Sequence, residues 1–345
     1  MPARFKKGMG EKSLAVTVVM GTVGLLLVSS VSAHSGCQTL AEETRMAVAA
    51  GDLKVLRRLH GDAGQETSCD SGFRAALGRA VALGLAREAQ RQIDNAAPPR
   101  IIEALLVEAL SYGRPWSLLA LWGDRYRLRR DYVAAATFYR DALLALGAEL
   151  PPGATPPPET AERLAGLARE TRLLAGVSYR PPSLRCGGTG HDEARIAALT
   201  ECRGRMPLPI QFERDKVTFT AAGQQVAEEL RETLAELGDP PIRIIGHTDQ
   251  FGVPELNRTL SQRRAEAVRR FLITRGYEAT IVVEGKGADM PLRLIGSYSK
   301  SEINSLNRRV EWSRLDDRPD EPGSPPATPL PRPTSAATLN QDNTP

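Results

Sequence analysis

The stretch Gly246-His247-Thr248-Asp249, followed by Leu260-Ser261-Gln262-Arg263-Arg264-Ala265, decides how the C-terminal part of the chain folds. The apolar run 242–246 predicts a strand that ends just before Asp249, and apolar residues at helical spacing predict a helix that opens at Leu260 or Ser261. The Arg264 guanidinium then lies fifteen positions after the Asp249 carboxylate, near the start of that helix. Such a pair suits a zwitterion, because one group binds an ammonium and the other a carboxylate.

Strands and helices alternate around this stretch. Short apolar runs predict the strands, at 207–212, 242–246, 280–283 and 310–312. Thr220 is a suitable N-cap for a helix that continues to Leu237, and Gly276 ends the helix that carries Arg264. The alternation predicts an α+β domain in which helices cover one face of a small mixed sheet.

Several further motifs follow in order along residues 207–314. They are Gly246-His247-Thr248-Asp249, Gly252, Asn257, Leu260-Ser261, Arg264-Ala265, Val268, Gly285 and Gly287 with Pro291, and Asn307-Arg308-Arg309-Val310-Glu311. Together they resemble the OmpA-like peptidoglycan-binding domain. Members of that family bind the stem peptides of peptidoglycan, usually at meso-diaminopimelate, which ends in an amino-acid head with an ammonium and a carboxylate.

The resemblance implies roles for individual residues. Asp249 would accept hydrogen bonds from the ammonium, and Arg264 would hold the carboxylate. Helix-start amides near Leu260 would favour the negative end of the ligand. The other implied site residues position the loop, add hydrogen bonds or add charge: Thr248, Asn257 and Arg308. The alternative for this pair is an ordinary salt bridge between Asp249 and Arg264. His247 is expected to be a packing residue at the end of the strand rather than a ligand.

Residues 37–180 are predicted to form an all-α domain. Within 116–149, five residues fall at the offsets of a tetratricopeptide repeat: Gly123, Tyr126, Ala135, Tyr139 and Ala142. Small residues at two of these positions allow two antiparallel helices to approach closely, and the tyrosines fill the space beside them. A repeat cannot bury its own face, so neighbouring helices must stack on it. This pattern predicts a protein partner for the helices, and an irregular helical bundle is the alternative.

The N-terminus has the features of an export signal. Basic residues precede an apolar or small run at 14–28, and Val31-Ser32-Ala33 fits a cleavage site, so residues 1–33 are predicted to be removed. The alternatives are a membrane anchor retained at 13–33 and a lipid attached at Cys37. Either alternative would tie the chain to the inner or outer membrane; cleavage predicts a periplasmic protein associated with the cell wall.

Export permits disulfides among the four cysteines. Of the three pairings, Cys37–Cys69 and Cys186–Cys202 are favoured because each pair lies within one segment, and unpaired cysteines remain the alternative. The second pair would close a loop inside a linker at 181–206. The Asp-, Pro-, Ser- and Thr-rich residues 315–345 predict a disordered tail.

The sequence favours a binding protein over an enzyme. Four widely separated histidines lack metal-ligand spacing, no Gly-x-Ser-x-Gly elbow is present, and no cofactor is indicated. The net charge is +4, and basic and acidic residues are interspersed, so the sequence does not indicate a surface that binds nucleic acid. A non-catalytic cell-envelope protein that binds peptidoglycan is therefore expected. The alternative is an assembly scaffold whose C-terminal domain no longer binds this ligand.

Overall fold

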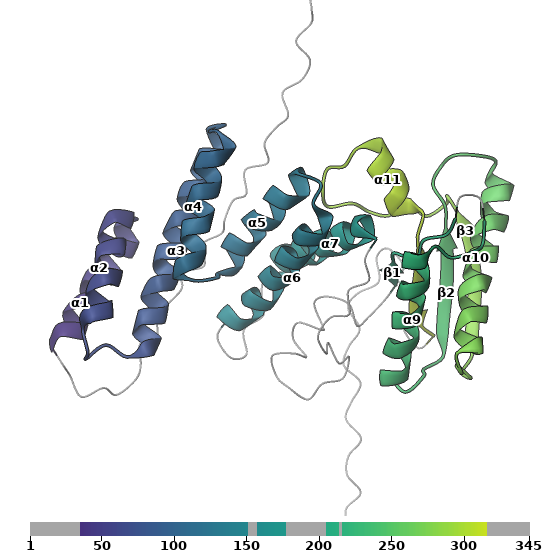
Figure 1. Cartoon of the computed structure of the whole chain (residues 1–345), viewed down its shortest axis with the longest axis horizontal. Helices are drawn as coiled ribbons and strands as arrows, with labels where there is room; N and C mark the ends of the chain where they lie inside the picture. Colours follow the sequence, from purple (N-terminus) through teal and green to yellow (C-terminus); the bar gives the residue numbers. More distant parts are fainter. Residues whose placement is uncertain (1–34, 151–156, 177–204, 214–215, 316–345) are drawn as a thin grey trace, which may run out of the picture.

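The computed structural model describes residues 35–150, 157–176, 205–213 and 216–315 (Figure 1). The predicted export signal, the predicted Cys186–Cys202 pair and all of the predicted tail after residue 315 lie outside these ranges. Within the described ranges, no helix is both long enough and apolar enough to cross a membrane.

The N-terminal region is helical, as predicted. Its helices are α1 (Ser35–Ala50), α2 (Leu53–Gln65), α3 (Ser71–Asp94), α4 (Pro99–Tyr112), α5 (Trp116–Leu128), α6 (Tyr132–Glu149) and α7 (Pro158–Ala175). Asp52, Asp70 and Asp131 begin α2, α3 and α6 by accepting a hydrogen bond from a backbone N–H three residues on. Proline fixes the start of α4 and α7, where its missing N–H costs nothing.

These helices enclose two apolar clusters. The first is formed by α1 to α4 with Leu118 and Trp122 of α5, and the second by α5, α6 and α7. Cys37 of α1 and Cys69, just before α3, form a disulfide across the first cluster, with Cα atoms 5.2 Å apart. This crosslink joins the first turn of α1 to the segment just before α3.

Helices α5 and α6 form an antiparallel hairpin at the place where the repeat pattern was recognised. A Cβ at Gly123 would lie 2.6 Å from the Tyr139 ring, so only glycine admits the tyrosine there. The rings of Trp122, Tyr126 and Phe138 stack pairwise, with centroids 5.3 to 5.8 Å apart. The chain reverses before Asp131, which caps α6. The hairpin is thus built by the predicted small-and-aromatic packing.

The C-terminal domain contains a four-stranded mixed sheet, and a small mixed sheet was predicted there. Its strands are β1 (Met206–Leu208), β2 (Ile242–His247), β3 (Ile281–Gly287) and β4 (Val310–Arg314), in the order β1-β4-β2-β3. Strands β2 and β3 are parallel, and β4 is antiparallel to both β1 and β2. The first strand is shorter than predicted: it ends at Leu208, and Phe212 makes an isolated bridge to Phe219.

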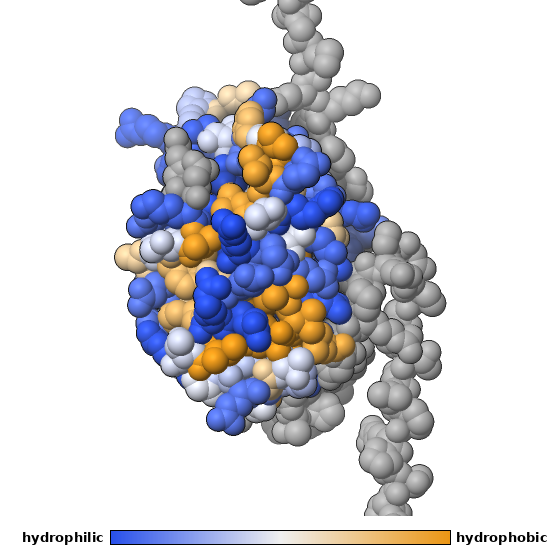
Figure 2. Space-filling view, turned by 90° about the vertical axis from the view of Figure 1, so that its right-hand side faces the viewer, coloured by the Kyte–Doolittle hydropathy of each residue, from blue (hydrophilic) through white to orange (hydrophobic). Residues whose placement is uncertain are grey.

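Helices α9 (Ala221–Glu236) and α10 (Pro254–Thr274) bury their apolar faces in one cluster with the sheet. Val226, Leu230 and Leu234 of α9 meet Val268 and Leu272 of α10 there, together with Ile242, Ile244 and Trp312 from the strands. Thr220 caps α9 as predicted, accepting from Gly223 N. Figure 2 shows the end of the molecule beyond α10 and β3, where small apolar groups lie among charged side chains.

Two helices also differ from the sequence prediction. Helix α10 begins at Pro254 rather than at Leu260 or Ser261, because proline at the first helical position and Glu255 in the first turn start it earlier. Its early turns are largely exposed, so they carry no apolar signal. Helix α11 (Lys300–Asn307) was not predicted; Ser299 and Glu302 begin it with a capping box.

Two glycines set how closely α10 approaches the sheet. A Cβ at Gly246 of β2 would lie 2.1 Å from Ser261 O, and one at Gly285 of β3 would lie 2.4 Å from Gln262 N. Ser261 Oγ also accepts a hydrogen bond of 2.9 Å from Gly287 N. These motif residues therefore serve packing, and they fix the height of α10 over the ends of β2 and β3.

We predict that Gly246→Ala destabilises the protein by about 1–3 kcal/mol or more, because the added methyl meets backbone rather than a flexible side chain. Gly61→Ala in α2 is the matched control, since nothing lies within 4 Å of a Cβ there and alanine favours helix. Urea unfolding followed by circular dichroism measures both. Equal stabilities of Gly246→Ala and the native protein would contradict the close approach.

Candidate functional site

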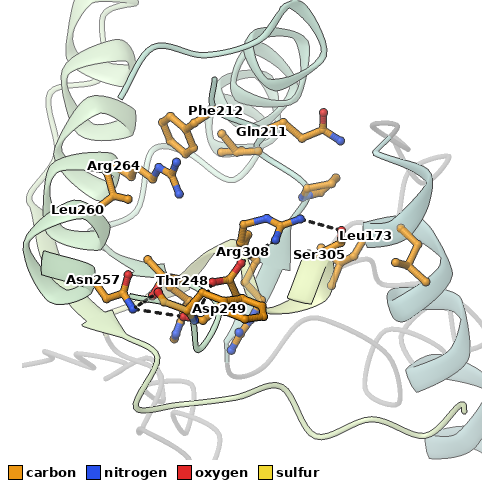
Figure 3. Close-up of a pocket in the computed structure, with 16 residues that line it drawn as sticks. Leu173, Gln211, Phe212, Thr248, Asp249, Asn257, Leu260, Arg264, Ser305 and Arg308 are labelled. Carbon is orange, nitrogen blue, oxygen red and sulfur yellow. Dashed lines mark hydrogen bonds and ion pairs between the residues drawn. The ribbon is translucent and has the colours of Figure 1, made fainter. Parts of the chain in front are cut away.

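A pocket of about 760 Å³ opens where β2 ends, between α10, α11 and α7 (Figure 3). It is lined by side chains from segments far apart in the sequence: Leu173, Leu174, Pro209, Ile210, Gln211, Phe212, His247, Thr248, Asp249, Phe251, Asn257, Leu260, Arg264, Ser305, Arg308 and Arg309. The site residues implied by the motifs, Thr248, Asp249, Asn257, Leu260, Arg264 and Arg308, are all among them. The fold thus brings into one pocket residues that are separated from one another in the sequence.

Asp249 stands on the loop after β2, with its side chain 15% exposed. Its Oδ1 accepts from Phe251 N at 3.1 Å, and its Oδ2 lies 2.6 Å from Arg308 Nη1. Asn257 of α10 donates to the carbonyl oxygen of Phe251 at 2.8 Å and holds the same loop. The carboxylate is therefore fixed in place by its own loop, and it is paired with Arg308.

Arg264 lies about three turns into α10 and is only 8% exposed. Its Nε donates to the carbonyl oxygen of Lys216 at 3.1 Å, and its guanidinium lies 5.0 Å from the centre of the Phe212 ring. In Figure 3 the side chain extends from α10 toward the pocket. A guanidinium held by a carbonyl and an aromatic face is oriented before any ligand arrives.

The early start of α10 corrects one expectation about the pocket. Leu260 lies in the second turn, so its amide hydrogen is bonded within the helix and does not form part of a helix start. Leu260 lines the pocket through its side chain. The prediction that helix-start amides near Leu260 favour the negative end of the ligand is therefore wrong, because it assumed that the helix begins at Leu260 or Ser261.

Thr248 gives the pocket a polar group without a protein partner. The residue is buried, and its Oγ1 has no hydrogen-bond partner within the described part of the chain. Its backbone N–H donates to Gly287 O at 2.9 Å, which ties the residue to β3. A buried hydroxyl left without a partner costs stability, and a ligand would satisfy it.

Comparison with known proteins identifies the domain that carries this pocket. Residues 211–304 match the model of the OmpA family. These residues form an OmpA-like domain. The chain is 36% identical over 107 residues to "Probable lipoprotein YiaD" of Escherichia coli (strain K12), covering 31% of this chain and 48% of that protein. It is 34% identical over 101 residues to "Outer membrane protein A" of Bordetella avium, covering 29% of this chain and 50% of that protein.

The chain thus spans about half the length of these curated relatives. Among solved structures it is similar to the peptidoglycan-associated lipoprotein from Burkholderia pseudomallei, with 28% identity, a TM-score of 0.25, and coverage of 30% of this chain and 86% of that one. The resemblance drawn from the motifs is confirmed for the OmpA-like domain, whereas repeat character in the helical region is not shown.

Three buried charged or titratable side chains lie at the wall of the pocket in the OmpA-like domain. His247 Nε2 is 3.3 Å from Glu311 Oε2, and Arg309 Nη2 is 2.6 Å from Glu311 Oε1. Burial opposes ionisation of Glu311, but the nearby His247 ring and the charge of Arg309 together lower the pKa of Glu311 to about 2. Burial lowers the pKa of His247, and the nearby Glu311 carboxylate opposes that shift only in part. Sequence reasoning treated His247 as a packing residue and did not anticipate this cluster.

The described ranges contain no group of three or more His, Cys, Asp or Glu side chains placed to hold a metal ion. The pocket instead offers the Asp249 carboxylate, the guanidiniums of Arg264 and Arg308 and the Thr248 hydroxyl. These groups are suited to bind an ion of mixed charge by hydrogen bonds and ion pairs.

The His247 pKa makes stability depend on pH. Above the ordinary value of 6.5 the imidazole is neutral in both states; below it, the unfolded chain takes up a proton that the folded protein resists, so stability falls with falling pH. We predict that His247→Gln reduces the loss between about pH 7 and 5, by at most about 1.4 kcal/mol per pH unit. Urea unfolding at several pH values measures the slopes, and equal slopes in both proteins would exclude this titration.

Proposed function

We propose that the protein is a non-catalytic component of the cell envelope that binds the peptidoglycan stem peptide in the pocket of its OmpA-like domain. The observation that carries this proposal is that Asp249 and Arg264 line one polar pocket from two different elements. Two curated relatives are named as an outer membrane protein and a probable lipoprotein, which supports an envelope location on the periplasmic side.

The ligand group that fits best is the amino-acid head of diaminopimelate. Its ammonium would bind the Asp249 carboxylate, whose two oxygens can accept hydrogen bonds at lone pairs beyond those that face Phe251 N and Arg308 Nη1. Its carboxylate would bind Arg264, with Arg308 contributing positive charge on the other side of the pocket. Thr248 Oγ1 would satisfy its missing hydrogen bond on the ligand.

We predict that Asp249→Ala and Arg264→Ala each weaken binding to isolated peptidoglycan by at least about tenfold, because each leaves one ligand charge unpaired in a mostly buried site. Arg263→Ala, an exposed neighbour on the same helix, is the matched control and should bind normally. Co-sedimentation with and without free meso-diaminopimelate measures the effect.

The alternative function, an assembly scaffold that no longer binds peptidoglycan, gives a different result. In that case the native protein does not sediment with the wall, and diaminopimelate changes nothing. Unaltered binding in both Asp249→Ala and Arg264→Ala would also remove the zwitterion site, even if the protein does bind the wall.

A second proposal concerns the helical region, which we propose binds a protein partner as a tetratricopeptide-like surface. The α5–α6 hairpin with Gly123 against Tyr139 supports a repeat-like unit. Large apolar side chains such as Val107 of α4 and Val133 of α6 are more than half exposed. Exposed apolar side chains of this kind contribute to protein interfaces when they gather.

We predict that the intact protein captures a specific partner from envelope extracts and that Val107→Asp weakens the capture, because a carboxylate opposes burial in an apolar interface. Val282→Asp on β3 is the matched control, since this valine is also exposed but lies in the OmpA-like domain. Quantitative mass spectrometry compares the three samples. Capture no greater than background with the native protein would refute the proposal.

A further inference from the structure

The helical region is joined to the OmpA-like domain by a buried carboxylate. Glu170 of α7 is 1% exposed, and its two oxygens accept hydrogen bonds from Ile295 N at 2.5 Å and Gly296 N at 3.0 Å. A Cβ at Gly166, one turn earlier, would lie 2.5 Å from Ile295 Cγ1. Helix α7 and the loop before α11 are therefore in direct contact, and a buried carboxylate there requires these two amides.

Other contacts extend this junction on both sides. Arg127 of α5 donates to Ser297 O at 3.3 Å and lies over the Tyr298 ring, while Glu302 of α11 pairs with Arg130 at 3.2 Å and accepts a hydrogen bond from Tyr132. Figure 1 shows α11 above α7, between the helices and the sheet. Arg308, which lines the pocket, is the C-cap residue of α11. The contacts between the helical region and α11 therefore also hold one residue of the pocket in place.

The same helix reaches the pocket itself. Leu173 and Leu174, one turn beyond Glu170, line it, and Figure 3 shows Leu173 across the pocket from Leu260 and Arg264. Arg172 between these leucines and Glu170 donates to Pro207 O at 3.2 Å, which holds the end of α7 against β1. Helix α7 therefore adds two apolar side chains, beside apolar residues of the OmpA-like domain such as Leu260, to a pocket whose charged groups come from that domain.

We infer that α7 is part of the ligand site: Leu173 and Leu174 contact the aliphatic part of the stem peptide while Asp249 and Arg264 hold its charged head. The inference rests on the proposed function and adds specificity-determining residues from outside the OmpA-like domain. The ligand has methylene and methyl groups beside its zwitterion, and burying these against leucine is favourable. Glu170 positions this wall and does not itself touch the ligand.

The test measures binding of a diaminopimelate-containing muropeptide to the full chain by isothermal titration calorimetry. Leu174→Gln should weaken binding about five- to tenfold, because a polar side chain replaces the apolar wall. Leu144→Gln, the same change at a half-exposed leucine of α6 that does not line the pocket, should leave binding unchanged. Binding of free diaminopimelate should fall less than that of the muropeptide in Leu174→Gln, since its apolar part is shorter.

Glu170→Gln supplies a second variant that leaves the pocket lining unchanged. An amide presents one oxygen and one NH₂ group to two backbone donors, so one donor loses its acceptor. Hydrogen exchange at Ile295 and Gly296 should quicken, and muropeptide binding should weaken as the wall loosens. Slower or unchanged exchange at these amides would show that α7 is not docked there, whether or not the protein binds the wall.

The outcomes separate the two proposals. If the native protein binds the muropeptide and both Leu174→Gln and Glu170→Gln bind it as tightly, the α7 wall is refuted while the peptidoglycan proposal stands. If the native protein binds no muropeptide, the proposed function fails and the ligand wall fails with it. Weaker binding in Leu174→Gln with a normal Leu144→Gln supports the inference.

Discussion

The close contact between α10 and the ends of β2 and β3 is the constraint on which the site depends. Gly246 and Gly285 leave no room for a side chain where the α10 backbone passes, and Ser261 bonds to Gly287 across the same contact. This contact sets α10, and with it Arg264 and Asn257, at a fixed height beside the loop that carries Asp249. The motif residues therefore form two groups: Gly246, Gly285 and Ser261 make this contact, and Arg264 and Asn257 are positioned by it. Substitutions in the first group would displace the second group without altering its chemical groups.

The charged residues at the pocket also form two groups, one that is paired in the interior and one that faces the pocket. Glu311, Arg309 and His247 lie in the sheet and its flank, where an unpaired charge would be costly. Their mutual contacts keep Glu311 ionised, which lets an Arg-rich motif enter the interior without leaving Arg309 uncompensated. Arg308, the neighbouring residue, points instead to Asp249 and the pocket. Two adjacent arginines therefore serve different purposes, one to complete a buried cluster and one to supply charge at the surface of the site.

Local sequence patterns predicted the helical region and the mixed sheet, and the resemblance to the OmpA-like family implied six of the residues that line the pocket. These patterns did not predict features that depend on exposed polar residues or on contacts between residues far apart in the sequence. The first turns of α10 are polar and exposed, so apolar spacing placed its start at Leu260 rather than Pro254. The α11 capping box of Ser299 and Glu302 sits in a short polar stretch that gives no apolar period. Leu173 and Leu174 belong to a helix with an ordinary amphipathic pattern, and nothing in that pattern indicates that they line the same pocket as Asp249, which is far away in the sequence.

The junction at Glu170 ties these parts together. A pocket formed within one domain keeps its shape when that domain moves, whereas a pocket with walls from two regions depends on how they are docked. Here the docking is carried by a buried carboxylate on backbone amides and by ion pairs to α11, and these hold the loop and helix that end at Arg308. Helices α7 and α11 therefore connect the helical region to the pocket, and Arg172 of α7 connects it to β1 of the sheet as well. The charged residues that line the pocket and the residues that join the two regions therefore belong to one connected set of contacts, although they share no sequence motif.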